Sequence, residues 1–156
     1  MIKNIEWGAV AYLKQSKYGL GTTDIAVNTT GGGTGNAYKT KISQSTTGNI
    51  YGVYDMSGGA WEYVMGNYND NMGNSGFSSM PAAKYYDKYT SNTGKTGDAT
   101  TETSGWYGDY AVFPYSSYPW FVRGGSDSGG TAAGVFGFNF GGRHNFYSTR
   151  AVLSAQ

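Results

Sequence analysis

The sequence contains no cysteine, a single histidine and three prolines in 156 residues. The lack of cysteine excludes disulfides, thiolate metal sites and a cysteine nucleophile. Charge is also scarce, because 13% of the residues are charged, the formal net charge is +1, and the lysines are scattered along the chain. A nucleic-acid surface needs clustered basic residues to neutralise phosphates, so we expect no nucleic acid partner.

The sequence also lacks long apolar runs. No stretch of 18 apolar residues is present, so we expect no direct insertion into a membrane. The N-terminus does not have the basic, apolar and small-residue pattern of a secretory signal. It starts with MIKNIEWGAV, already inside a helical pattern, which favours a C-terminal piece of a longer protein. Residues 1–156 are expected to form a single domain, since that length is typical of one.

Glycine and tyrosine, by contrast, are abundant, with 26 and 15 residues respectively. Loops bury little aliphatic area themselves, so aromatic side chains are a natural means of holding many short elements together. This composition indicates a loop-rich domain without long helices.

The clearest predicted element is a helix over residues 4–15, NIEWGAVAYLKQ. Trp7, Val10 and Ala11 follow the spacing of one helix face, and Asn4 is a suitable N-cap. Trp7 is interpreted as a core anchor, in keeping with the usual burial of tryptophan.

Long polar stretches separate the apolar ones. Residues 19–48 contain few apolar side chains, and the segment NTTGGGTGN at 28–36 is predicted to be a flexible surface loop. A phosphate-binding role for its glycines is the alternative, although no Gly-Lys-Ser/Thr follows them. Within residues 67–105, the stretch 80–89 is the one candidate short helix, starting at Pro81.

Three stretches share a resemblance to one family. NIEWGAVAYL, GVYDMSGGAWEYV (residues 52–64) and FVRGGS (residues 121–126) resemble, in the same order, segments of the formylglycine-generating-enzyme family. The resemblance implies an α+β fold of the C-type lectin-like, formylglycine-generating-enzyme subtype. Such a fold is loop-rich, with a small antiparallel sheet and one or two helices.

The chemistry of that family does not carry over to these residues. Formylglycine formation uses a cysteine pair that binds copper, and related sulfoxide-forming members hold iron with three histidines. This chain has no cysteine, and His144 is its single histidine, so we expect no enzyme activity and no catalytic cofactor.

The resemblance also implies a candidate structural calcium. Its ligands would come from Ser57, Gly58, Ala60 and Glu62, with Glu62 supplying the carboxylate. The alternative is that Glu62 is bonded to nearby backbone amides in a tight turn.

A second resemblance covers the C-terminal segment. RGGS (123–126), AGVF (133–136) and TRAVL (149–153) resemble the anchors of the variable region in target proteins of diversity-generating retroelements. Thr149 stands where phenylalanine is usual. The resemblance implies a hypervariable ligand-binding region at about residues 121–153.

The genetic code offers an independent check on this resemblance. These retroelements mutate adenines, and an AAC codon changed at its first two positions never encodes Lys, Glu, Gln, Met or Trp. Residues 121–153 contain none of those five residue types. All eight lysines precede residue 96, whereas all three arginines follow it. Lysine-poor glycine-rich strands are the alternative explanation.

We expect this segment to alternate between scaffold and display. Inward anchors are predicted at Trp120, Val122, Val135, Phe136, Val152 and Leu153, with the alternate side chains pointing outward along the pleat. The displayed, ligand-binding set is predicted to be Asp127, Ser128, Thr131, Ala132, Gly137, Asn139, Phe140, Arg143, His144, Asn145, Phe146 and Tyr147. Core packing remains the alternative for Phe138 and Phe140, and a plain exposed loop residue for His144.

The expected function is therefore non-catalytic recognition of a protein or glycan ligand on a cell or phage surface. Rigid rings with small polar neighbours are typical of such binding surfaces. We expect display on a bacterial cell surface or a virion. The alternatives are a non-variable adhesin or tail-fibre domain and, less favoured, an enzyme completed by residues outside this segment.

Overall fold

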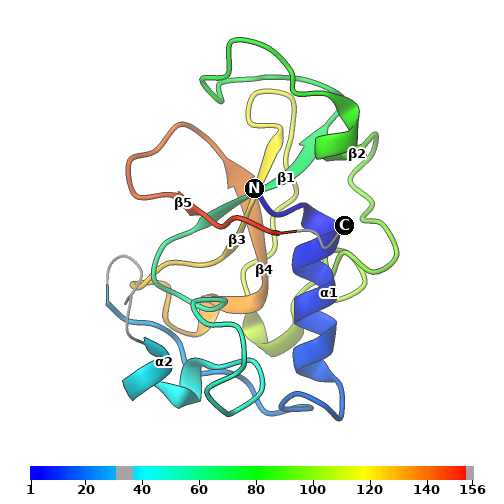
Figure 1. Cartoon of the computed structure of the whole chain (residues 1–156). Helices are drawn as coiled ribbons and strands as arrows, with labels where there is room; N and C mark the ends of the chain where they lie inside the picture. Colours follow the sequence, from blue (N-terminus) through cyan, green and yellow to red (C-terminus); the bar gives the residue numbers. More distant parts are fainter. Residues whose placement is uncertain (31–36, 154–156) are drawn as a thin grey trace.

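The computed structural model describes residues 1–30 and 37–153 (Figure 1). Within these residues the chain forms one long helix, several short helical turns and a small sheet, with loops between them. The helices are α1 (Asn4–Gln15) and the four-residue α2 (Ala37–Thr40). The strands are β1 (Glu62–Tyr68), β2 (Asp87–Tyr89), β3 (Trp120–Gly124), β4 (Gly134–Gly141) and β5 (Ser148–Thr149). No helix in this described part is both long and apolar enough to cross a membrane.

The sheet has the strand order β2-β1-β3-β4, and β5 pairs with the beginning of β1. β3 is antiparallel to both β1 and β4, whereas β2 and β5 run parallel to β1. The predicted antiparallel sheet is therefore a mixed one, because β2 and β5 both run in the direction of β1. The α+β class and the loop-rich character are as expected.

The helix predicted over residues 4–15 is confirmed at both ends. Its N-cap is Lys3 rather than Asn4, because the backbone N–H of Lys3 donates to the Glu6 carboxylate at 2.7 Å. Asn4 is instead buried, where its side chain donates to the Tyr89 hydroxyl at 2.8 Å. Trp7 is fully buried, as predicted.

The helix lies against the sheet, with contacts to β1 and β4 (Figure 1). The indole N–H of Trp7 donates to the carbonyl of Val135 at 2.8 Å, which fixes α1 to β4. The main core lies on this face and contains Val64, Phe121 and Phe136. A smaller cluster, Met65, Tyr86 and Trp120, covers the other face. The sheet is therefore packed on both faces.

Packing on both faces changes the predicted alternation in β3. All five residues Trp120–Gly124 are buried, including Phe121 and Arg123, which the pleat would have pointed outward. Arg123 is accommodated because its guanidinium donates to the carbonyls of Gly137, Asp98 and Ala99 and to the side chain of Asn4, at 2.8–3.0 Å. Scaffold and display do not alternate along this strand.

Four of the six predicted anchors are buried, and two are not. Trp120, Val122, Val135 and Phe136 are at most 1% exposed. Val152 and Leu153 were predicted to point inward but are 41% and 96% exposed. β5 pairs with β1 over two residues only, and the chain beyond it leaves the sheet.

The polar stretches are joined to the rest of the molecule where the structure describes them. The predicted flexible loop at 28–36 lies mostly outside the described residues, but Asn28 is buried and its side chain donates to Asp55 at 2.9 Å. The helix predicted at 80–89 is wrong. That stretch holds a single helical turn at Ala83–Tyr85 and then β2, because Asp87–Tyr89 pairs with the end of β1.

Candidate functional site

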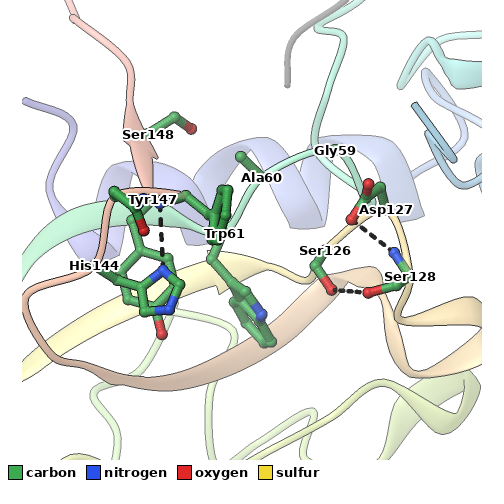
Figure 2. Close-up of a pocket in the computed structure, with 11 residues that line it drawn as sticks. Gly59, Ala60, Trp61, Ser126, Asp127, Ser128, His144, Tyr147 and Ser148 are labelled. Carbon is green, nitrogen blue, oxygen red and sulfur yellow. Dashed lines mark hydrogen bonds between the residues drawn. The ribbon is translucent and has the colours of Figure 1, made fainter. Parts of the chain in front are cut away.

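An open groove lies at the end of the sheet where β1 begins and β5 joins it (Figure 2). Its volume is about 900 Å³, which falls within the range of roughly 300–1,000 Å³ common for ligand sites. We call it the Trp61 groove. Three segments line it, namely Gly59–Ala60–Trp61, Ser126–Asp127–Ser128 and His144–Asn145–Phe146–Tyr147–Ser148.

Backbone hydrogen bonds join the glycine turn before Trp61 to the segment after β3 that lines the groove. The backbone N–H of Gly58 donates to the carbonyl of Gly124, and the N–H of Asp127 donates to the carbonyl of Gly59, both at 2.9 Å. Gly125 has φ +83°, and a Cβ there would lie 2.5 Å from the Cα of Ala133. The Gly-Gly of GVYDMSGGAWEYV and the Gly-Gly of RGGS are thus joined by the hydrogen bond from Gly58 to Gly124, and Gly125 lies too close to Ala133 to carry a side chain.

Trp61 stands in the middle of the groove. Figure 2 shows its indole ring between His144 and Tyr147 on one side and Ser126 on the other. The ring is half-buried and meets Tyr110 edge-on, with ring centres 6.3 Å apart. Its backbone carbonyl accepts from the N–H of Ser148 at 2.8 Å, so the backbone beneath the ring is held by β5.

Stacked rings form one wall. His144 lies parallel to Tyr147 at 5.0 Å and contacts Phe146 at 5.2 Å, and its Nδ1 accepts from the N–H of Phe146 at 3.3 Å. Tyr147 also packs edge-on against Tyr63 at 5.4 Å. Burial raises the pKa of Tyr147, so its phenol keeps the proton at neutral pH and can donate a hydrogen bond. Tyr63 donates to the carbonyl of Gly142, which holds the start of this loop.

Small polar side chains form the opposite wall. Oδ1 of Asp127 accepts from the N–H of Ser128 at 2.8 Å, which orients the carboxylate. The hydroxyls of Ser126 and Ser128 lie 3.4 Å apart. This wall therefore offers two hydroxyls and a carboxylate, held by a short turn after β3.

Behind the groove, an ion pair anchors the end of the ring-bearing loop. The Arg150 guanidinium binds both carboxylate oxygens of Glu62 and donates to the carbonyls of Tyr54 and Asp55. Burial raises the pKa of Glu62, and the hydrogen-bonded guanidinium opposes that rise. The ion pair connects the chain after β5 to the beginning of β1.

This ion pair does not fit the expected calcium site. Both carboxylate oxygens of Glu62 are bound by Arg150, and the carbonyl of Ser57 accepts from the N–H of Asn28 at 2.8 Å. The N–H of Gly58 donates to the carbonyl of Gly124, and Ala60 lines the groove. Among residues 1–30 and 37–153 no three His, Cys, Asp or Glu side chains are gathered as metal ligands.

Half of the predicted display set comes together in the Trp61 groove, from loops far apart in sequence. These residues are Asp127, Ser128, His144, Asn145, Phe146 and Tyr147. Ala132 and Asn139 line a smaller hollow of about 200 Å³, which shares Trp61 and Ser126 with the groove.

The other four predicted residues lie elsewhere. Thr131 and Arg143 are exposed outside the lining of both hollows. Phe140 is half-buried and stacks on Tyr118 at 5.5 Å. Gly137 is buried and its carbonyl accepts from Arg123, so it offers no surface for display. Phe138, left open between core and display, is a core residue at 2% exposure.

Sequence reasoning did not place Trp61, Gly59, Ser126 or Ser148 in the site. Period-two alternation would have missed Trp61, because that pattern points Trp61 and Tyr63 inward and the charged Glu62 outward. In the structure Glu62 is the buried residue, paired with Arg150, and Trp61 is half-buried. Nothing in the sequence signals Ser148, because its place depends on pairing with β1.

Comparisons with family models, with curated proteins and with solved structures find no match to this chain.

Proposed function

We propose that this protein is a non-catalytic recognition module whose C-terminal segment provides a ligand-binding groove. The main support for this proposal is that the turn at 126–128 and the loop at 144–148 meet around Trp61. The groove combines rings with hydroxyl, amide and carboxylate groups, which suits recognition by contact and hydrogen bonding. This chemistry needs neither a nucleophile nor a metal.

The proposal includes a C-type lectin-like fold of the formylglycine-generating-enzyme subtype. The α+β architecture and the single long helix before the sheet support that assignment. The close approach of Gly58–Gly59 and Gly124–Gly125 gives a physical reason for the two glycine-rich signature stretches to occur together.

The proposal also includes diversification of the gene segment for residues 121–153 by a retroelement. The loop at 143–146 supports it, because all four residues are exposed and can change without disturbing the core. The neighbouring DNA tests this part. A reverse transcriptase gene and an adenine-rich near-copy of the segment are expected beside the gene, and their absence would favour a non-variable adhesin or tail-fibre domain.

Binding itself is tested by selecting ligands and then removing groove side chains. We expect Phe146→Ala, Asn145→Ala and Asp127→Ala each to weaken binding of a selected protein or glycan ligand. The matched controls Thr131→Ala and Arg143→Ala alter exposed residues of the same segment outside the groove. Equal effects of both groups would show that the groove is not the binding site.

The expected ligand is a protein or glycan on a cell or phage surface, and the expected location of this protein is a bacterial surface or a virion. A recognition surface with many possible sequences is useful where foreign ligands are met. Immunofluorescence on intact cells and immunogold labelling of phage particles test the location.

A further inference from the structure

The charge of the Trp61 groove restricts its ligand. Its eleven lining residues include one carboxylate, Asp127, and one imidazole, His144, but no lysine or arginine. The lining therefore has no lysine or arginine to pair with a phosphate, sulfate or carboxylate group of a ligand. A strongly cationic ligand would meet a single carboxylate, of which one oxygen already accepts from Ser128. The lining therefore favours a neutral ligand.

The rings of the groove offer flat surfaces already fixed in orientation. Trp61 is braced by the edge contact to Tyr110, and Tyr147 by contacts to both His144 and Tyr63. An aromatic face carries partial negative charge, so it attracts the weakly positive C–H groups on the apolar face of a pyranose ring. Rings that are already held lose little entropy when a ligand stacks on them.

The polar groups surround these rings at the rim. Ser126, Ser128 and Tyr147 carry hydroxyls that both donate and accept, and Asn145 adds an amide that does the same. Among the described residues the indole N–H of Trp61 has no hydrogen-bond acceptor, which leaves a further donor at the centre. A ligand with many hydroxyls around an apolar face matches this arrangement.

A second hollow adjoins the groove. The smaller hollow beside it is lined by Tyr110, Ala132 and Asn139 and is bordered by the same Trp61 and Ser126. Two adjoining hollows that share one indole suit a ligand made of linked, similar units.

We propose that the Trp61 groove binds a neutral oligosaccharide, with one sugar ring stacked on Trp61 and hydroxyls held by Asp127, Asn145 and the serines. This inference rests on the proposed function, because it names the ligand class of the same groove. It assigns Trp61, which lies outside the segment 121–153, as the contact shared by all variants of that segment.

The test is an array of immobilised oligosaccharides. Neutral members built from glucose, galactose, mannose and N-acetylglucosamine are printed beside sialylated and sulfated ones. We expect retention of neutral members and little change in retention as salt is raised, because no ion pair contributes. Retention of the acidic members alone, or of no oligosaccharide, would overturn the inference.

Substitutions in the groove then test which side chains contact the retained neutral oligosaccharide. Trp61→Ala should weaken binding by roughly 30-fold, the size typical of a central aromatic contact. Asp127→Ala and Asn145→Ala should each cost up to about tenfold and serve where Trp61→Ala fails to fold. Ligand-induced change in tryptophan fluorescence should be lost in Trp61→Phe and kept in the control Trp106→Phe, because Trp106 does not line the groove. Unchanged affinity in all three alanine variants contradicts the inference.

A parallel selection from a library of displayed proteins separates the two proposals. If a selected protein binds, loses affinity in the groove variants, and no oligosaccharide is retained, the carbohydrate inference fails while the proposed function stands. If ligands bind but no groove variant affects any of them, both fail.

Discussion

β3 and the loop at 143–146 belong to the same C-terminal segment, yet their environments are opposite. Every residue of β3 is buried, including the charged Arg123, whereas all four residues of the loop are exposed. β3 lies between two other strands and between two apolar clusters, while the loop connects β4 to β5. Buried and exposed side chains are therefore divided by segment rather than by alternating residues.

The largest change in stability should come from a substitution in the buried core. Phe136 is 1% exposed and packs against Tyr12, Trp106 and Tyr107. Phe136→Ala should lower the free energy of unfolding by about 3–5 kcal/mol, because the core cannot close around the lost ring. Denaturant unfolding of the purified variant measures this. A loss as small as that of an exposed residue would place Phe136 outside the core.

A second effect should come from the glycine turn that ends β3. Gly125→Ala should cost roughly 2–4 kcal/mol, since a Cβ at φ +83° is strained and would also meet Ala133 at 2.5 Å. Gly97→Ala is the matched control, because Gly97 has φ +92° with no atom within 4 Å of the added Cβ. The difference in thermal midpoint between the two variants isolates the close approach. Equal losses would mean that the close approach of Gly125 to Ala133 adds no cost beyond the strained backbone.

A smaller effect should come from Asp109, whose ionisation should make the stability of the fold depend on pH. Burial raises its pKa from 3.8 to about 7, against the hydrogen bond from the N–H of Phe136. Between these two values the folded chain holds a proton that the unfolded chain has released. Stability should therefore be highest at the acidic end and fall as the pH rises to about 7, by on the order of 1–3 kcal/mol from this group.

Asp109→Asn tests whether Asp109 causes this fall of stability with pH, which is the slope of unfolding free energy against pH. The amide keeps an acceptor for Phe136 and does not ionise, so the part of the slope due to Asp109 should vanish. Urea unfolding at several pH values measures both proteins. A slope unchanged in the variant would assign the pH dependence to another group.

The smallest effect should come from the loop. Phe146→Ser and Asn145→Ala should change stability by no more than about 0.5 kcal/mol, because exposed side chains lose little when replaced. Calorimetric midpoints compared with that of Phe136→Ala test the division between scaffold and loop. If the loop variants melt as early as the core variant, the loop is part of the scaffold and is not free to vary.

Local sequence pattern predicted those features that depend on near neighbours. The helix Asn4–Gln15 follows from the apolar spacing around Trp7, and a loop-rich α+β chain follows from its glycine and tyrosine content. Trp120 and Phe136 are buried as their size and apolarity predict, because large rings gain most by leaving water.

Only the tertiary structure decided what depends on residues distant in sequence. β2 and β5 are three and two residues long, too short to carry a pattern, and each exists because it pairs with β1. Glu62 is paired with Arg150, 88 residues away. The groove itself forms where three separate segments meet around Trp61. Such pairings gain their free energy through contacts across the folded chain, so no single stretch of sequence contains them.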